Sequence, residues 1–214
     1  MNLYEKYRPT TFDEVIGQTK AVQTIQKHLD RWGWGGQAYW ISGASGTGKT
    51  TLARIIAAQG ADEFCIEEFD SADRLDMEAL DSIEIEQRQY GWGKGGRAFI
   101  VNEAHGLRAP TIRRLLGLLE RIPQHVVWVF TTTREGCDKL FDDQIDASPL
   151  LSRCHEIRLT NQGLNKVFAE RAQQIATAEN LNGKPIKAYE QLARDCHNNM
   201  RRMLMQIQDR VMVE

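Results

Sequence analysis

The sequence predicts an α/β protein with a five-stranded parallel sheet, helices on both faces, and a small helical domain after it. Short apolar or β-branched runs alternate with helix-like segments up to about residue 160, which is typical of parallel sheets with helical connections. From Asn161 onward only helix-like segments occur, interrupted at Asn182 to Pro185. We therefore expect an α/β domain over 1–160 and a helical domain over 161–214.

The expected elements follow one another in a regular order. A helix is expected over 20–31, where Val22, Ile25 and Leu29 lie near helical spacing. Strands are expected at 38–42, 64–69, 98–101, 126–131 and 155–159. Further helices are expected over 51–59, 77–89 and 110–121. The run VVWVFT is the clearest strand signal, because β-branched and aromatic residues favour extended backbone.

Charge, hydrophobicity and cysteine spacing argue against several classes of protein. The net charge of −2 lacks the basic excess that drives independent binding to nucleic acid, so such contact must be local or shared. No apolar run reaches the roughly 18 residues of a membrane span, and the amino terminus does not resemble a secretory signal. We expect a cytoplasmic protein without membrane contact. Cysteines 65, 137, 154 and 196 form no C-x-x-C pair, which favours core thiols over a zinc site or disulfides.

The segment GASGTGKT, between an expected strand and an expected helix, matches the phosphate-binding pattern G-x-x-x-x-G-K-[ST]. Glycines let successive backbone amides point at phosphate oxygens, and the helix that follows adds the positive end of its dipole. Lys49 is expected at the β and γ phosphates and the Thr50 hydroxyl at Mg²⁺, so ATP and Mg²⁺ are the predicted cofactors. The candidate binding residues are Gly43, Ala44, Ser45, Gly46, Thr47, Gly48, Lys49, Thr50 and Thr51.

A second motif begins where the strand AFIV ends in Asn102 and Glu103, at a point where such ATPases carry an acidic pair. Glu103 can orient and deprotonate the attacking water, although a solvated acid at a helix start is the alternative. Asn102 lacks the charge that normally helps to hold Mg²⁺, but its amide oxygen can accept hydrogen bonds from the ion's waters. We therefore expect nucleotide binding to be more secure than fast hydrolysis.

Four long strings then resemble one family: YRPTTFDEVIGQ, QYGWGKGGRAFIVNEAH, LLGLLERIP and LSRC. They resemble the clamp-loader AAA+ ATPases, meaning the gamma/tau subunit of bacterial DNA polymerase III and the small subunits of replication factor C. With the helical segments that follow, the resemblance spans nearly the whole chain. The resemblance implies an AAA+ P-loop fold with a helical lid. It also implies ATP hydrolysis that helps to load a sliding clamp onto primer-template DNA, together with other AAA+ subunits in a hetero- or homo-oligomer.

The resemblance also implies roles for single residues. Thr133 matches the polar residue called sensor 1, with Thr132 as the second choice, and Arg153 in LSRC matches the arginine finger that enters a neighbouring subunit. A surface salt bridge is the alternative for Arg153. The residues that match the adenine-side segment, which can equally be a packing strap, are Tyr7, Arg8, Val15 and Ile16.

The helix HNNMRRMLMQIQ resembles the sensor 2 helix, with Arg201 at the nucleotide-facing position and Arg202 in solvent. Arginine there can couple lid closure to the γ phosphate. Asn198 and Asn199 replace the family's usual glycine and small acidic residue.

In the family, the helix after the second ATP motif follows the template backbone. Arg108, Arg113 and Arg114 are the matching candidates for DNA phosphates, with a solvated helix face as the equal alternative. The clamp-docking segment corresponds to residues 77–92, of which Trp92, set among glycines, is the expected exposed anchor. Its other apolar residues, some of which must be core, are Met77, Leu80, Ile83, Ile85 and Tyr90.

Three departures from the family bear on mechanism. The zinc-binding insert of many gamma/tau subunits is absent, the loop over 134–149 carries several acids, and the chain ends before a helical collar. Formation of a stable pentamer by this chain alone is therefore not expected. Two alternatives to a hydrolysing clamp loader stay open. One is a nucleotide-binding scaffold subunit with weak or no hydrolysis, and the other is another AAA+ role: helicase loader, branch-migration motor or mobile-element ATPase.

Overall fold

A computed structural model of the chain describes residues 1–133 and 148–213. The acidic loop singled out in the sequence, 134–149, falls almost entirely outside these residues. The chain divides into two compact units. One, here called the sheet unit, comprises 20–43 and 49–158, and the other, the helical unit, comprises 1–19, 44–48 and the chain from 159 onward.

The sheet unit contains five parallel strands in the order β2-β3-β4-β1-β5. The strands are β1 (Gln37–Ser42), β2 (Ala61–Phe69), β3 (Gly96–Val101), β4 (Val126–Thr132) and β5 (His155–Arg158). All five were predicted, and the parallel sheet is confirmed. Because parallel strands end at the same edge, Ser42, Val101 and Thr132 bring the segments that follow them together.

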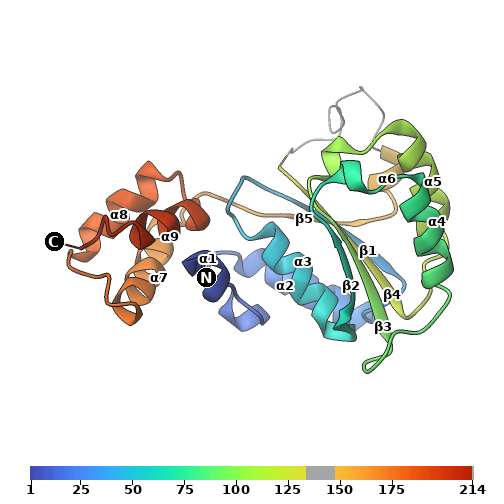
Figure 1. The fold of residues 1–214 in the computed structure, drawn as a ribbon, viewed down its shortest axis with the longest axis horizontal. Coiled ribbons are helices and arrows are strands. Elements are labelled where there is room, and N and C mark those ends of the chain that lie inside the picture. The colour runs from blue at the N-terminus through green and yellow to red at the C-terminus, as the bar shows by residue number, and fades with distance from the viewer. Residues whose placement is uncertain (134–147, 214) are drawn as a thin grey trace. The chain divides into compact units, whose positions relative to one another are not determined.

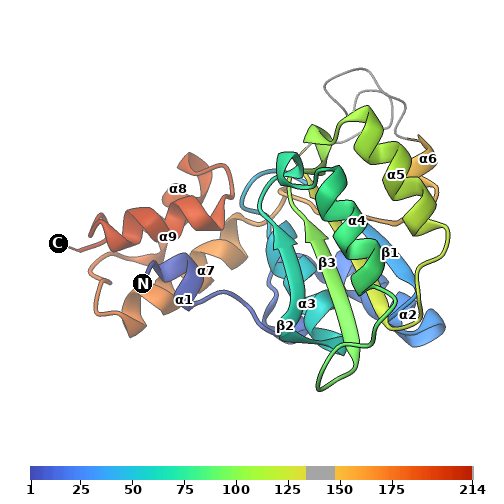
Figure 2. The ribbon, with the colours of Figure 1, turned by 45° about the vertical axis from the view of Figure 1, so that its right-hand side comes forward.

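Helices cover both faces of this sheet (Figure 1). In both views of the ribbon, α4 and α5 pack on one face and α3 on the other (Figure 2). Their bounds lie within three residues of the predicted helices: α2 (Thr19–Trp32), α3 (Lys49–Gly60), α4 (Met77–Glu86) and α5 (Ala109–Leu119). The other helical pieces of this unit are short: η2 (Ala72–Arg74), η3 (Ala104–Gly106) and α6 (Ser148–Leu151).

Alternating side chains build the core of the sheet unit. Trp40, Phe99 and Trp128 point to the face that α4 and α5 cover, where Trp128 stacks on Phe130 at 5.8 Å between ring centroids. Tyr39 and its neighbour Ile41 are fully buried too. Strands buried on both faces read as continuous apolar runs, which is why the run in β4 gave such a clear signal.

The helical unit packs α7 (Asn165–Ala178), α8 (Ile186–Asp195) and α9 (Met200–Gln208) with two amino-terminal pieces, α1 (Leu3–Lys6) and η1 (Phe12–Glu14). Leu3 is buried in its core, and the Leu3 amide donates to Gln208 Oε1 at 3.0 Å. The sequence-based boundary at 160 grouped residues 1–19 with the sheet. Contacts group them with the helices, because the apolar face of α1 is buried against α9.

Among the described residues, no helix combines the length and apolar character that crossing a bilayer requires. Three cysteines in the described ranges, Cys65, Cys154 and Cys196, are free thiols. Burial raises the pKa of Cys154 to about 12, with a smaller contribution from Glu156. Core thiols are therefore what the structure shows at these positions.

A pair of histidines makes the sheet unit sensitive to pH. His28 of α2 and His155 of β5 lie 4.4 Å apart between ring centroids. Desolvation lowers the pKa of His28, whose buried Nδ1 has no hydrogen-bond partner among the residues that the structure describes. Desolvation, and then the charge of His28, lower the pKa of His155. The unfolded chain therefore binds more protons than the folded chain just below pH 6.5, so stability falls as pH falls.

We expect the melting temperature to drop between pH 7.5 and 5.5, and His28→Phe to reduce that drop by about half, because it removes one proton acceptor and its repulsion of His155. Thermal unfolding followed by circular dichroism checks this. Lys27→Ala, on the same helix, serves as the control and should keep the full drop. An unchanged drop in His28→Phe would contradict the assignment.

Candidate functional site

The phosphate-binding loop follows β1 directly and ends where α3 begins at Lys49. Gly46 and Gly48 adopt positive φ angles of 77° and 102°, which glycine tolerates best. A Cβ added at Gly48 would meet no atom within 4 Å, so this part of the loop is open. Lys49 is buried and its Nζ donates to the Gly43 carbonyl at 2.9 Å. A triphosphate fits this loop chemically: open backbone, a lysine and a helix amino terminus.

Thr50 and Asn102 meet at the carboxyl edge of the sheet. The Thr50 hydroxyl donates to Asn102 Oδ1 at 3.1 Å, and the Thr131 hydroxyl donates to the same oxygen at 2.9 Å. Asn102 is only 7% exposed, so these hydroxyls take the place of solvent around its amide oxygen. The two residues predicted at the metal are thus direct neighbours.

Their donor set suits Mg²⁺. This hard cation prefers oxygen ligands and usually keeps one or two protein ligands besides phosphate oxygens and waters. Within 1–133 and 148–213, no group of three His, Cys, Asp or Glu side chains is arranged to hold a metal by itself. Magnesium would therefore be held by the Thr50 hydroxyl together with nucleotide oxygens, with the Asn102 amide oxygen beside it.

Glu103 follows Asn102 in a left-handed backbone conformation, φ 50° and ψ 44°, which is uncommon for a residue other than glycine. The Thr133 hydroxyl donates to Glu103 Oε2 at 3.2 Å, and His105 Nδ1 lies 3.4 Å from that oxygen. Thr132, the second choice for sensor 1, is fully buried against His105. Of the two threonines, Thr133 is therefore the one whose hydroxyl contacts the candidate base.

Arg153 lies in the short turn between α6 and β5. Its guanidinium donates to Glu120 at 2.6 Å and to the Pro149 carbonyl at 2.7 Å. The side chain is 30% exposed. These contacts are those of a surface ion pair, the alternative considered for this residue, and its role as an arginine finger stays a prediction.

In the helical unit, the loop residue Gly46 lies against Asn199. A Cβ at Gly46 would come within 2.0 Å of Asn199 Oδ1, so only glycine fits there. Asn199 also caps α9, because its side chain accepts from the Arg202 amide at 3.1 Å. Asn198 adopts φ 55°, and asparagine tolerates this left-handed conformation where the family uses glycine. Asn199 therefore supplies the cap of α9, and Asn198 supplies the left-handed turn before it.

The other predicted nucleotide residues of the helical unit have partners within it. Arg201 is exposed, with its guanidinium 5.5 Å from the centre of the Tyr4 ring. The Tyr7 hydroxyl donates to Glu179, and this bond raises the pKa of Tyr7. Arg8 pairs with Glu5. Ile16 packs against the helical core, and Val15 follows η1 as a half-buried residue. These contacts fit a packing strap, and adenine contact stays a prediction.

The three candidate DNA arginines differ in their surroundings. Arg114 pairs with Asp81 at 3.0 Å and with Glu84, and these partners raise its pKa. Arg113 is exposed, and Arg108 is 77% exposed with Asp73 at 3.8 Å. Arg114 therefore joins α5 to α4, while the other two keep the exposure that phosphate contact requires.

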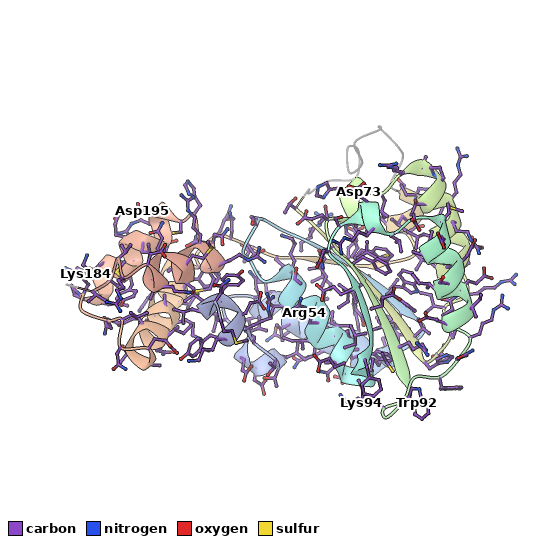
Figure 3. The ribbon with its side chains drawn as sticks, in the orientation of Figure 1. Arg54, Asp73, Trp92, Lys94, Lys184 and Asp195 are labelled. Carbon is purple, nitrogen blue, oxygen red and sulfur yellow. The ribbon has the colours of Figure 1, made fainter. Side chains whose placement is uncertain are left out.

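The apolar residues of the predicted clamp-docking segment also differ in how exposed their side chains are. Leu80 and Ile83 are fully buried core residues. Trp92 is 77% exposed, and Figure 3 shows it at the outer end of the loop before β3. The other exposed apolar residues of the segment are Met77, Ile85 and Tyr90.

Two residues of the site were not predicted as such. Gln18 is buried and bridges the loop to residue 160: its amide donates to the Thr47 and Thr160 carbonyls at 3.3 and 2.7 Å. Gln18 ends the string YRPTTFDEVIGQ, which resembles the family's adenine-side segment, so the sequence did contain a signal for this residue. Glu68 accepts from Asn102 Nδ2 at 2.7 Å. Nothing in the sequence pairs strand β2 with residue 102, so only the structure reveals it.

Comparison with known proteins agrees with these motifs. The chain is 34% identical over 157 residues to the DNA polymerase III subunit gamma/tau of Mycobacterium tuberculosis, covering 62% of this chain and 27% of that protein. It is 30% identical over 190 residues to subunit gamma of Buchnera aphidicola (78% and 49%) and 27% identical over 221 residues to subunit tau of Escherichia coli (93% and 33%). The chain thus spans from about a quarter to about half of these relatives. No protein-family model matches it.

Among solved structures, the chain is similar to the RuvB Holliday junction branch migration motor of Thermotoga maritima, with a TM-score of 0.70 at 24% identity over 94% of this chain and 64% of that one. At this identity the likeness shows the fold alone, and that fold is the AAA+ fold. The sequence relatives, the parallel sheet and the helical unit agree, and the chain is similar to the clamp-loader AAA+ family over most of its length.

Proposed function

We propose that the chain is a clamp-loader-like ATPase subunit, which binds and hydrolyses ATP to help load a sliding clamp onto DNA. The observation that carries the proposal is the meeting of Thr50 with Asn102, and of Thr133 with Glu103, at the carboxyl edge of the sheet. A residue that only shaped the fold would not need a carboxylate held in a left-handed backbone at this edge of the sheet.

Each side chain has its own role in the proposed binding and hydrolysis of ATP. Lys49 leaves the Gly43 carbonyl to contact the β and γ phosphates, and Mg²⁺, when bound, neutralises charge on the phosphate oxygens. Glu103 accepts the proton of the attacking water, and the Thr133 hydroxyl keeps the carboxylate aimed. Arg201 contacts the γ phosphate. Arg153 releases Glu120 and contacts the nucleotide that is bound to a neighbouring subunit.

The proposed partners are other AAA+ subunits, a sliding clamp and primer-template DNA. The relatives are named as subunits of DNA polymerase III, which supports a replication complex. Trp92, Tyr90 and Ile85 are each exposed apolar side chains, which suit contact with a protein partner. Arg108 and Arg113 supply the local positive charge that a net charge of −2 requires for DNA contact.

The arginines provide a test with its own control. The double variant Arg108→Ala with Arg113→Ala should weaken DNA binding and reduce the slope of log affinity against log salt by about two, one for each phosphate contact that is removed. Fluorescence anisotropy of a labelled primer-template at several salt concentrations measures this. Arg114→Ala should leave the slope unchanged and lower the melting temperature, because it breaks the link between α4 and α5. Equal slopes for wild type and double variant would contradict the proposal.

Phosphate release, measured with and without primed DNA, tests the proposal as a whole. DNA-stimulated turnover supports the hydrolysing subunit. Asn102 favours one alternative, a scaffold subunit in which bound ATP only maintains a conformation; tight ATP binding without turnover would establish it. A motor or loader unrelated to clamps, the other alternative, would respond to its own DNA substrate and not to primer-template junctions.

A further inference from the structure

A carboxylate on the edge strand of the sheet contacts the residue that replaces the usual magnesium-site acid. Glu68 of β2 accepts from Asn102 Nδ2 at 2.7 Å, and its side chain is only 18% exposed. Arg54 of α3 donates to both Glu68 oxygens, at 2.7 and 3.2 Å. All three residues belong to the sheet unit.

The chemistry of these partners decides which way the Asn102 amide faces. Its two other contacts, Thr50 and Thr131, are hydroxyls, which can donate or accept and so suit either orientation. A carboxylate can only accept, so Glu68 requires the amide NH₂. A reversed amide would place Asn102 Oδ1 against a Glu68 oxygen with no hydrogen between them. Glu68 is thus the partner that selects the orientation.

This orientation matters for Thr50. When Asn102 presents oxygen, the Thr50 hydroxyl donates its hydrogen to that oxygen and keeps its lone pairs for a cation. When Asn102 presents NH₂, the amide donates to the Thr50 oxygen and competes with the metal. We propose that Glu68, held by Arg54, is a positioning residue that keeps the Asn102 oxygen toward Thr50 and thereby sets the magnesium affinity of the nucleotide site. The inference rests on the proposed function for its nucleotide readout.

Glu68→Gln should reverse the network. Arg54 has only donors, so it will take the carbonyl oxygen of the new glutamine and leave the glutamine NH₂ facing Asn102. Asn102 must then turn its oxygen to that NH₂ group and its own NH₂ to Thr50. We expect the gain in ATP affinity on adding Mg²⁺ to fall about tenfold, the size of one misplaced buried hydrogen bond.

Asn102→Asp, which restores the family's acid, should destabilise the fold through the same contact with Glu68. The introduced carboxylate would face the Glu68 carboxylate with no hydrogen between the two acids, and such like charges are unfavourable. We expect a melting temperature lower by about 3 °C or more at pH 8. In the double variant Asn102→Asp with Glu68→Gln, the glutamine NH₂ donates to one oxygen of the introduced aspartate, whose other oxygen accepts from Thr50 and Thr131.

The experiment is a double-mutant cycle on the whole chain. A fluorescent ATP analogue is titrated with Mg²⁺ and with EDTA, and the ratio of the two Kd values is compared for wild type, both single variants and the double variant. Glu68→Gln should show the roughly tenfold smaller magnesium gain, and the double variant should recover the wild-type gain. Glu63→Gln, the same charge change on an exposed residue of β2, is the control and should match wild type.

Thermal unfolding without nucleotide separates this inference from the proposed function. If the wild-type protein bound no nucleotide, the proposed function would be refuted. The claim that Glu68 sets the magnesium affinity would be refuted with it. The coupling between residues 68 and 102 would still be judged by the melting temperatures. Additive effects of the two substitutions, or a magnesium ratio in Glu68→Gln equal to that of Glu63→Gln, would overturn the positioning role.

Discussion

Replacing Lys49 by alanine is expected to weaken the binding of ATP and ADP in the presence of Mg²⁺ by at least about 100-fold, or about 2.7 kcal/mol. Lys49 is buried at the start of α3, and its ammonium group is aimed back at the Gly43 carbonyl across the phosphate loop. A phosphate anion in that loop is a stronger partner than a neutral carbonyl, because hydrogen bonds between ions are about twice as strong. Without the ammonium group, the loop offers only backbone amides and the helix dipole.

Isothermal titration calorimetry with ATP or ADP and Mg²⁺ measures this effect. Alanine is the best helix former, so α3 should begin normally, and a melting temperature near the wild-type value would show that the fold persists. Lys166→Ala, which removes an exposed lysine of α7, is the matched control and should not change the Kd. Nucleotide affinity that is the same in Lys49→Ala and wild type would refute the phosphate-binding assignment.

The second large effect concerns turnover. Glu103→Gln should lower the rate of phosphate release by about 10²- to 10⁴-fold, the usual contribution of a general base, while the affinity for ATP changes less than about threefold. Glutamine has the size of glutamate and can still accept the hydrogen of the Thr133 hydroxyl, so the local geometry should remain. It cannot accept a proton from water, and the substitution also removes one negative charge beside His105.

Single-turnover phosphate release with primed DNA measures the rate, and titration of a fluorescent ATP analogue measures the affinity. Glu170→Gln, on an exposed position of α7, controls for the loss of one negative charge and should leave the rate unchanged. A rate in Glu103→Gln equal to that of this control would assign Glu103 to the alternative role, a solvated acid at the start of η3.

Local sequence patterns were sufficient for the fold of the sheet unit. The strands β1, β3 and β4 are apolar on both faces, so each gave a continuous run bounded by polar or glycine residues. Strand β2 began three residues earlier than expected, at Ala61, and α4 ended three residues earlier, at Glu86. These ends are decided by hydrogen bonds to neighbouring elements, which the sequence does not display.

The division of the chain was harder to predict. Residues 1–19 precede the first strand in sequence and were grouped with the sheet. Their contacts lie with α7 and α9, and Gln18 links the phosphate loop to residue 160. The contact between Gln18 and Thr160 joins positions 142 residues apart, and no local pattern records it.

What the sequence by itself determined is the parallel sheet and the chemistry of the phosphate loop, because both follow from patterns within a few consecutive residues. What only the tertiary structure decided is which polar groups meet at the edge of that sheet and around it: Asn102 with Glu68 rather than alone, Arg114 with α4 rather than solvent, and Asn199 with Gly46. The physical reason is that hydrogen bonds and ion pairs form between whichever groups the packed strands and helices bring within about 3 Å.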